Sequence, residues 1–382
     1  MELKKELPEI FEEFAEQRKK SFLEIKEIKE KDIPVIGVFC TYLPREIPNA
    51  MGAAVVGLCS VSDETIPDAE KELPRNLCPL IKSSYGFART DKCPFFHFSD
   101  LVVGETTCDG KKKMYELLAE FKPVYVVELP NRQTEDGIQM YRKELIRFKD
   151  FLEQKFDRKI TEEAIRHQIH LRNGINKALH RLQYLMTQDP APVNGLDIIN
   201  TAYGSGFNMD IESMEEQINA VIQKIETEYK EGKNVGKKAR ILLTGSPSGG
   251  AALKVVRAIE ENGGVVVCFE NCTGVKALEC VDEDNPDVYD ALARKYLNIG
   301  CSCMSPNKNR LNLLEQLIDD FHVDGVVDLV LQACHTYNVE TAMIRKLVKE
   351  KKGLPYVVVE TDYSQADVEQ INTRMAAFIE ML

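Results

Sequence analysis

The chain has 382 residues, of which 44% are hydrophobic and 29% charged, and its formal net charge is −12. This length allows two or three domains, and the acidic balance argues against nucleic acid and anionic membrane as main partners, because both need a positive surface. No apolar run approaches the ~20 residues of a membrane span, and the start MELKKELPEIFEEFAEQRKK is too charged for a signal peptide, so we expect a cytoplasmic protein.

Eleven cysteines are the unusual feature of the composition. Reducing compartments seldom keep disulfides, so buried packing, redox thiols and metal ligands remain as explanations. Several of these cysteines lie in turns beside Pro, Gly, Asn or Asp, which favours ligands. Their spacing is not a compact C-x-x-C array, and paired histidines are missing nearby, so the pattern indicates iron–sulfur rather than zinc.

The segment 33–135 predicts a first α/β domain, after an N-terminal helical segment at 1–32. Short apolar runs separated by helical periodicity are typical of buried parallel strands. We expect these strands at 33–39, 53–58, 101–103 and 124–127.

Cysteines stand at the turns of this domain. Cys78 and Cys93 each precede a proline that opens a helix, because proline suits the first helical position. Cys108 lies between a strand and an amphipathic helix, where the positive end of the helix dipole favours a thiolate. Cys40 and Cys59 directly follow the first two strands.

Residues 136–237 change character and predict a helical insert. Strand signals disappear, and long charged helices are expected at 138–156, 161–186 and 211–229, with a break at 195–210. We expect the insert to space the two α/β halves or to form the surface of a homodimer.

The α/β pattern resumes in a second domain at 238–382. Strands are expected at 241–243, 265–269, 323–331 and 356–359. The fold class predicted is therefore α/β, with two doubly wound, parallel, four-stranded domains, a helical insert and an N-terminal helix.

Such sheets bind ligands beyond the carboxyl ends of their strands. Five cysteines fall at that edge by this interpretation, namely Cys40, Cys59, Cys108, Cys272 and Cys334. Cys268 lies inside a strand and is interpreted as packing, whereas Cys93, Cys272, Cys301 and Cys303 form a second group of candidate ligands beside Cys78, Cys108 and Cys334.

Other features have competing explanations. The loop TGSPSGGAALK at Gly245 imitates a dinucleotide fingerprint, but its spacing differs and Pro247 removes a donor, so a plain strand-to-helix turn is favoured. The run Lys111–Lys113 is expected to be solvated, with contact to an acidic redox partner as the alternative. His335 and Glu105, which lie beside candidate ligands, are candidate proton donors.

Several segments together resemble one known family. They are LCPLIKSSYG at Cys78, ETTCDGKKK at Cys108, LQACHTY at Cys334, CTYLPREIPNAMG at Cys40 and the C-terminal TRMAAFIE. They resemble the 2-hydroxyacyl-CoA dehydratase and benzoyl-CoA reductase subunit family over nearly the whole chain. The resemblance implies two α/β domains and an iron–sulfur cubane held by Cys78, Cys108 and Cys334.

The surplus cysteines resemble the double-cubane cluster proteins within that family. Their implied cofactor is an [8Fe–9S] double cubane held by six thiolates, and we expect Cys93, Cys272 and either Cys301 or Cys303 to supply the second three. The resemblance also implies an ATP-dependent iron–sulfur reductase as electron donor and a small-molecule substrate. The alternatives are a dehydratase subunit with a single [4Fe–4S] cluster, acting on an acyl-CoA, and a non-catalytic electron carrier.

Overall fold

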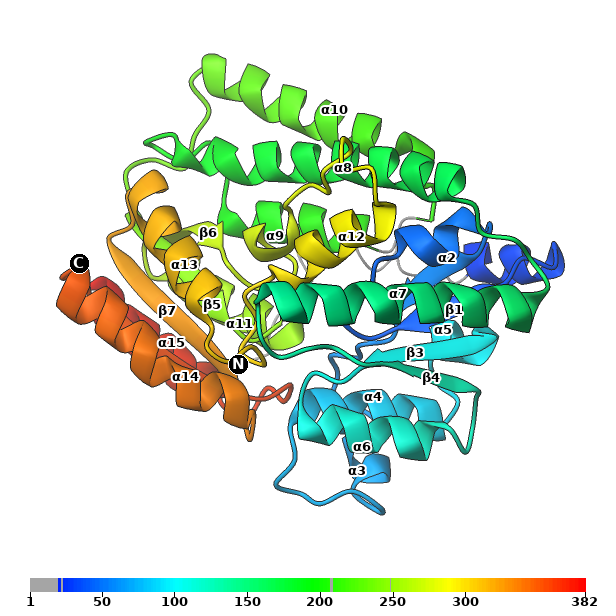
Figure 1. Cartoon of the computed structure of the whole chain (residues 1–382). Coiled ribbons are helices and arrows are strands. Elements are labelled where there is room, and N and C mark those ends of the chain that lie inside the picture. The colour runs from blue at the N-terminus through cyan, green and yellow to red at the C-terminus, as the bar shows by residue number, and fades with distance from the viewer. Residues whose placement is uncertain (1–19, 22, 207–208, 248) are drawn as a thin grey trace.

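The computed structural model describes residues 20–21, 23–206, 209–247 and 249–382. Within them the chain forms two α/β halves, each on a parallel four-stranded sheet, with long helices between them (Figure 1). The predicted fold class is confirmed. The predicted N-terminal helix lies largely outside the described residues, and of its described part, 20–21 and 23–30 are helical.

The first sheet has the strand order β2-β1-β3-β4. Both of its faces are buried, because neighbouring residues of a strand point to opposite faces: Leu101 and Val103 belong to one hydrophobic core and Val102 to the other. The elements of this half of the chain are β1 (Val35–Val38), α2 (Glu46–Ala50), β2 (Ala54–Gly57), α3 (Ile66–Ala69), α4 (Pro79–Arg89), α5 (Pro94–Phe98), β3 (Leu101–Glu105), α6 (Asp109–Leu118) and β4 (Val124–Val127).

The second sheet repeats this arrangement with the order β6-β5-β7-β8. Cys268 is fully buried in β6, which confirms its predicted packing role. The elements of this part of the chain are β5 (Ala239–Gly245), α11 (Gly250–Glu261), β6 (Gly264–Phe269), the 3-10 turn η2 (Val275–Ala277), α12 (Val288–Leu297), α13 (Lys308–Asp320), β7 (Gly325–Leu331), α14 (His335–Arg345), the π-helix η3 (Lys346–Lys351), β8 (Tyr356–Thr361) and α15 (Val368–Ile379). Of these, α12 packs on α7 and belongs to the hydrophobic core of the first sheet.

The loop after β5 is shaped by its contact with β7. Gly245 has φ +106°, and a Cβ there would lie 2.1 Å from the carbonyl oxygen of Leu329. The Ser246 N–H donates to that same oxygen at 2.7 Å. Close packing of neighbouring strands thus accounts for Gly245, in agreement with the plain strand-to-helix turn.

Long helices join the two halves. They are α7 (Glu135–Phe156), α8 (Glu162–Tyr184), the 3-10 turn η1 (Leu185–Thr187), α9 (Gly195–Ser205) and α10 (Ile211–Lys230). Helix α8 bridges both cores: Ile165 and Ile169 pack into the first half, and Ala178 and Leu182 pack into the second. The domain limits drawn from the sequence remain a prediction.

The expected break at 195–210 is wrong for most of its length, because α9 occupies 195–205. One face of this helix is buried through Ile198, Ile199 and Ala202, and the Glu260 carboxylate accepts the N–H of Gly195 at 2.6 Å. Tertiary packing therefore stabilises a helix whose glycine-rich sequence is a weak helix former.

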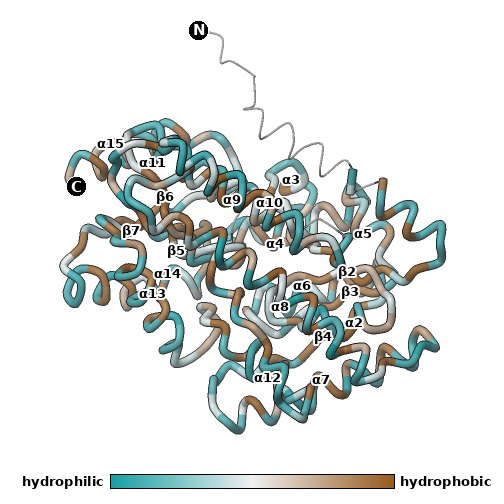
Figure 2. The backbone as a smooth tube through the Cα atoms, turned by 90° about the horizontal axis from the view of Figure 1, so that it is seen from above, coloured by the Kyte–Doolittle hydropathy of each residue, from teal (hydrophilic) through white to brown (hydrophobic). Residues whose placement is uncertain are grey.

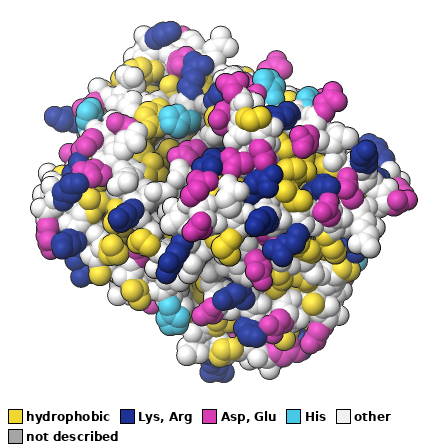
Figure 3. Space-filling model, viewed as in Figure 1, with side chains coloured by type: hydrophobic (Ala, Val, Ile, Leu, Met, Phe, Trp, Pro, Cys, Tyr) yellow, Lys and Arg dark blue, Asp and Glu magenta, His cyan; other side chains and the backbone are white. Residues whose placement is uncertain are grey.

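The carboxyl ends of the two sheets point toward each other across the middle of the molecule (Figure 1). Hydrophobic segments run through the strands, whereas outer helices such as α7 alternate between hydrophobic and hydrophilic residues (Figure 2). On the face shown in Figure 3, acidic and basic side chains are interspersed. No helix in the described part of the chain is long and apolar enough to cross a membrane.

Candidate metal centre

The turns at the facing edges of the two sheets bring cysteines together. Every strand but β4, β5 and β8 is followed within three residues by a cysteine. The five expected at this edge are there: Cys40 after β1, Cys59 after β2, Cys108 after β3, Cys272 after β6 and Cys334 after β7.

Cys78, Cys108 and Cys334, which we call the first thiol group, are the N-caps of α4, α6 and α14. The thiols of Cys78 and Cys334 hydrogen-bond to each other across the two halves. This hydrogen bond lowers the pKa of Cys334 to about 7 and raises that of Cys78. The hydrogen bond therefore favours the thiolate form of Cys334 over that of Cys78.

Cys108 reaches this place because α4 and α6 begin side by side. A Cβ on Gly110 would lie 2.6 Å from the Ile81 Cδ1 atom and 3.3 Å from the Leu77 Cδ1 atom. Leu77 and Gly110 are close in sequence to Cys78 and Cys108, so the glycine allows the starts of the two helices to approach.

Cys40, Cys272, Cys301 and Cys303 form a second thiol group, which again combines both halves. The Cys301 and Cys303 thiols hydrogen-bond to each other, and Cys40 interacts electrostatically with Cys301 and Cys272. Tyr42 ties this group to the first half: its hydroxyl donates to the carbonyl of Ile299 at 2.8 Å and lies 3.8 Å from the Cys303 sulfur.

Two buried lysines supply positive charge beside the thiols. The Lys111 ammonium lies 3.9 Å from the Cys59 sulfur, and the Lys276 side chain is fully buried. The Lys276 charge lowers the pKa of Cys301, after the larger effect of the hydrogen bond with Cys303. The expectation that the run 111–113 is solvated is thus wrong for Lys111, because the first turn of α6 faces the interior.

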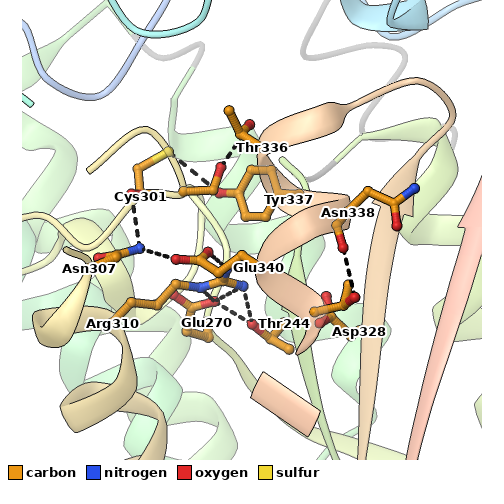
Figure 4. A network of polar contacts seen from close by, with 12 residues as sticks. Thr244, Glu270, Cys301, Asn307, Arg310, Asp328, Thr336, Tyr337, Asn338 and Glu340 are labelled. Atoms are coloured by element: carbon orange, nitrogen blue, oxygen red, sulfur yellow. Dashed lines mark hydrogen bonds and ion pairs between the residues drawn. The ribbon is translucent and has the colours of Figure 1, made fainter. Parts of the chain in front are cut away.

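A buried polar network holds the second thiol group in place (Figure 4). Lys276 pairs with Glu270 at 3.0 Å and donates to the Tyr337 hydroxyl at 3.1 Å. That hydroxyl lies 3.6 Å from the Cys301 sulfur. Arg310, only 1% exposed, bonds to Glu270 as well, so the carboxylate is shared by two cations.

Figure 4 also shows how the loop that carries Cys301 is tied to α14. The Asn307 amide donates to the Cys301 carbonyl oxygen at 3.0 Å and to the Glu340 carboxylate at 2.6 Å. The Cys301 loop is thereby fixed to the helix that begins after Cys334, and the two thiol groups are held relative to each other.

Glu105 and His335, the candidate proton donors, lie in opposite environments. Glu105 is fully buried, and its carboxylate has no hydrogen bond to another side chain among the described residues. Burial raises the pKa of Glu105 to about 7, against the opposing effect of Lys111. His335 is exposed at the first position of α14. The structure thus places the carboxyl, and not the imidazole, in the interior beside the thiols.

Cys93 is separated from the other candidate ligands. It is the N-cap of α5 and follows the carboxyl end of α4, whose 11 residues span ~16 Å from Cys78. Helix α5 leads to Asp100, whose N–H donates to the carbonyl of Val35 at the start of β1. Cys93 therefore lies toward the amino ends of the strands, away from the edge where the other six are placed.

The structure places Cys40, and not Cys93, beside Cys272 and Cys301, while the ligand role of Cys93 stays a prediction. The position of Cys40 directly after a buried strand predicts a residue at the carboxyl edge of the sheet, but periodicity along one segment does not say which thiols from distant turns meet. The sequence has no comparable signal that would place Lys111, Lys276 or Tyr42 beside the thiols.

The chemistry of the donor set suits an iron–sulfur group. Thiolates are the usual ligands of such clusters, and both thiol groups combine soft donors with buried positive charge or hydroxyl groups. Within the described residues, no three His, Cys, Asp or Glu side chains meet closely enough to hold one metal ion. The residues present fit a cluster that is bound through thiolates from both halves.

A cavity of about 280 Å³ adjoins the second thiol group. Cys40 and Cys272 line it together with Cys59 and Lys111, while α8 and α9 form its other wall. A small molecule in this inner cavity would lie against two members of the second thiol group.

Comparison with known proteins gives consistent matches. The family model described as HGD-D, 2-hydroxyglutaryl-CoA dehydratase, D-component, matches residues 40–382. The chain is 53% identical over 383 residues to "Putative dehydratase subunit YjiM" of Escherichia coli strain K12, with 100% of both chains covered. It is 24% identical to the (R)-phenyllactyl-CoA dehydratase beta subunit of Clostridium sporogenes, with 97% of each chain covered, and 21% identical to a subunit of the benzoyl-CoA reductase of Thauera aromatica, with 91% and 90% covered.

Proposed function

Because this chain belongs to the 2-hydroxyglutaryl-CoA dehydratase D-component family, we propose that it is an iron–sulfur oxidoreductase with a double-cubane [8Fe–9S] cluster. In this proposal, an ATP-dependent iron–sulfur reductase supplies low-potential electrons, and a small molecule is reduced. The observation that supports two cubanes is the presence of two thiol groups, each of which combines cysteines from both halves.

The proposed ligands follow these groups. Cys78, Cys108 and Cys334 would hold one cubane, with thiols from α4, α6 and α14. The second thiol group would supply three thiolates for the other, with Cys40 in place of Cys93. Of the two cysteines in the GCSC turn, Cys301 is the better candidate, because the Lys276 charge lowers its pKa and the Tyr337 hydroxyl lies 3.6 Å from its sulfur.

The chain's own residues would tune and protect such a group. When bound, the cluster would supply low-potential electrons to the substrate. Lys111 and Lys276 would offset the negative charge of the thiolates, and the Tyr337 hydroxyl near Cys301 would donate a hydrogen bond to sulfur. Glu105, whose pKa of about 7 allows it to hold a proton near neutral pH, would deliver protons inside the water-poor site.

A second candidate function is a dehydratase subunit with a single [4Fe–4S] cluster in the first thiol group. The names of the E. coli and C. sporogenes relatives favour it. It predicts about four irons per chain and no effect of the second thiol group on iron content.

The experiment is the iron and acid-labile sulfide content of protein purified without oxygen. The proposal predicts about eight irons and nine sulfides per chain, and the single-cluster alternative about four irons. Cys40→Ala and Cys272→Ala should each lose a large share of the iron, whereas Cys93→Ala and the exposed control Cys280→Ala should retain it. Full iron in the Cys40 and Cys272 variants would contradict the second cubane, and a protein without iron would contradict both candidate functions.

A further inference from the structure

Two arginines whose guanidinium groups form no ion pair among the described residues lie where the halves of the molecule meet. Arg45 directly precedes α2, and Arg172 lies on α8, between the segments of that helix that enter the first and second cores. Among the described residues, neither guanidinium takes part in a hydrogen bond or an ion pair. We call these two residues the arginine pair.

The arginine pair borders two cavities at once. One is the inner cavity beside the second thiol group, and the other is an outer cavity of about 340 Å³. On α8, Gln168 lines only the outer cavity and Ile175 only the inner one, with Arg172 between them lining both. The same holds along the other wall, where Arg45 lies between Thr41 of the inner cavity and Asn49 of the outer. The pair therefore stands at the boundary between the two spaces.

The charges around the pair favour an anion. Burial lowers the pKa of Arg45, and the neighbouring Arg172 charge lowers it further. Two guanidinium groups that repel each other are stabilised when an anion binds to both. The nearby Glu105 and Glu46 carboxylates oppose this effect on the pKa of Arg45, but among the described residues neither forms an ion pair with a guanidinium of the pair, and Glu46 accepts the Tyr296 hydroxyl instead at 2.9 Å.

Other charged groups act in the same direction. Lys111 adds a third cation inside the inner cavity. Two carboxylates, Asp210 and Glu212, line only the outer cavity. An anion is therefore better placed between the guanidinium groups and the inner cavity than in the outer one.

We propose that the arginine pair binds the carboxylate of a small organic acid and holds the rest of that molecule in the inner cavity, against the second thiol group. This inference rests on the proposed function, because it names the substrate class of the same site. A guanidinium binds a carboxylate through two parallel hydrogen bonds, which gives orientation as well as affinity. At about 280 Å³ the inner cavity is near the lower limit of ligand pockets, which favours a small acid over an intact coenzyme A ester.

The test is isothermal titration calorimetry on the anaerobically purified full chain. The probes are acetate and lactate, with neutral acetamide as the uncharged control and coenzyme A as the phosphate-bearing competitor. The variants are Arg45→Gln, Arg172→Gln and Arg172→Lys, and the matched control is Arg75→Gln, because the Arg75 side chain is 91% exposed. Circular dichroism establishes that each variant is folded.

We expect acetate or lactate to bind at one site per chain and acetamide not to bind. Each glutamine variant should weaken carboxylate binding at least about tenfold, since a charge-assisted hydrogen bond is lost, while Arg75→Gln leaves it unchanged. Arg172→Lys should keep more affinity than Arg172→Gln, because it retains the charge but not the fork of donors.

Three results would overturn the inference: no carboxylate binding, binding that is equal in the glutamine variants, or arginine-dependent binding of coenzyme A alone, which would assign the pair to a phosphate. Iron content is measured on the same samples. Normal iron without carboxylate binding contradicts this inference and leaves the proposed function standing. Carboxylate binding by a protein without iron contradicts the proposed function and supports the arginine site.

Discussion

The ion pair of Lys276 and Glu270 allows a quantitative test of the buried network. Both side chains are fully buried, and the ammonium lies 3.0 Å from one carboxylate oxygen. Removal of one partner of a buried pair costs ~3–5 kcal/mol, because the other charge remains uncompensated. Arg310 still lies 3.4 Å from the second oxygen of Glu270, so we expect Lys276→Met to destabilise the protein by ~3 kcal/mol, at the lower end of that range.

The assay is urea denaturation followed by circular dichroism, with Lys351→Met as the matched control. Lys351 also pairs with a carboxylate, Glu315, at 2.6 Å, but its side chain is 61% exposed, so its loss should cost ~1 kcal/mol or less. If the two variants differ by less than ~1 kcal/mol, the reasoning from burial is refuted. In the Lys276→Met background, Glu270→Gln should cost less than in the wild type by ~1 kcal/mol or more, because the amide needs no counter-charge.

Three further predictions concern single residues. Glu105 has a pKa of about 7 in the folded state and 4.5 as its ordinary value, so its contribution to stability is complete below about pH 4.5 and is lost as the pH rises through 7. Glu105→Gln should therefore match the wild type near pH ~4 and exceed its urea stability by ~3 kcal/mol near pH ~8, and a gap that does not change with pH would contradict this. Gly245→Ala should lower stability by ~2 kcal/mol or more, because φ is +106° and the new Cβ would lie 2.1 Å from the Leu329 oxygen, and a thermal midpoint equal to wild type would disprove the strain. Thr161→Ala should cost ~1 kcal/mol in the same assay, because the Thr161 side chain accepts the Ala164 N–H at 3.1 Å at the start of α8, whereas Thr161→Ser should be nearly neutral.

Local pattern was sufficient for the architecture and for part of the site. Continuous apolar runs such as 101–103 and 265–269 predict strands that are buried on both faces, and the parallel sheets place the following turns at one edge. A cysteine before Pro79 or directly before a helix, as at Cys108, therefore marks a helix start at that edge. Buried strands and helix starts depend on a few neighbouring residues, and the structure has them where the sequence predicts them.

Other features depended on how distant segments pack. Helix α9 forms at 195–205 because β6 and α11 cover it, although its glycines are weak helix formers. Lys111 follows Cys108 in a polar run, yet the first turn of α6 is turned inward, so that one lysine of three is buried. The composition of a segment does not say which of its faces will be buried against the other half of the molecule.

The membership of the second thiol group was decided in the same way. Cys93 and Cys40 are both turn cysteines, but α4 carries the chain back to the opposite edge before Cys93, whereas Cys40 follows β1 directly. The arginine pair could not be predicted from the sequence for the same reason. Arg45 and Arg172 are far apart in the chain and meet only because α2 packs on α8. The sequence by itself determined the strands and the edge at which they end; the packing of one half against the other, through a helix that enters both cores, decided which side chains share the space between them.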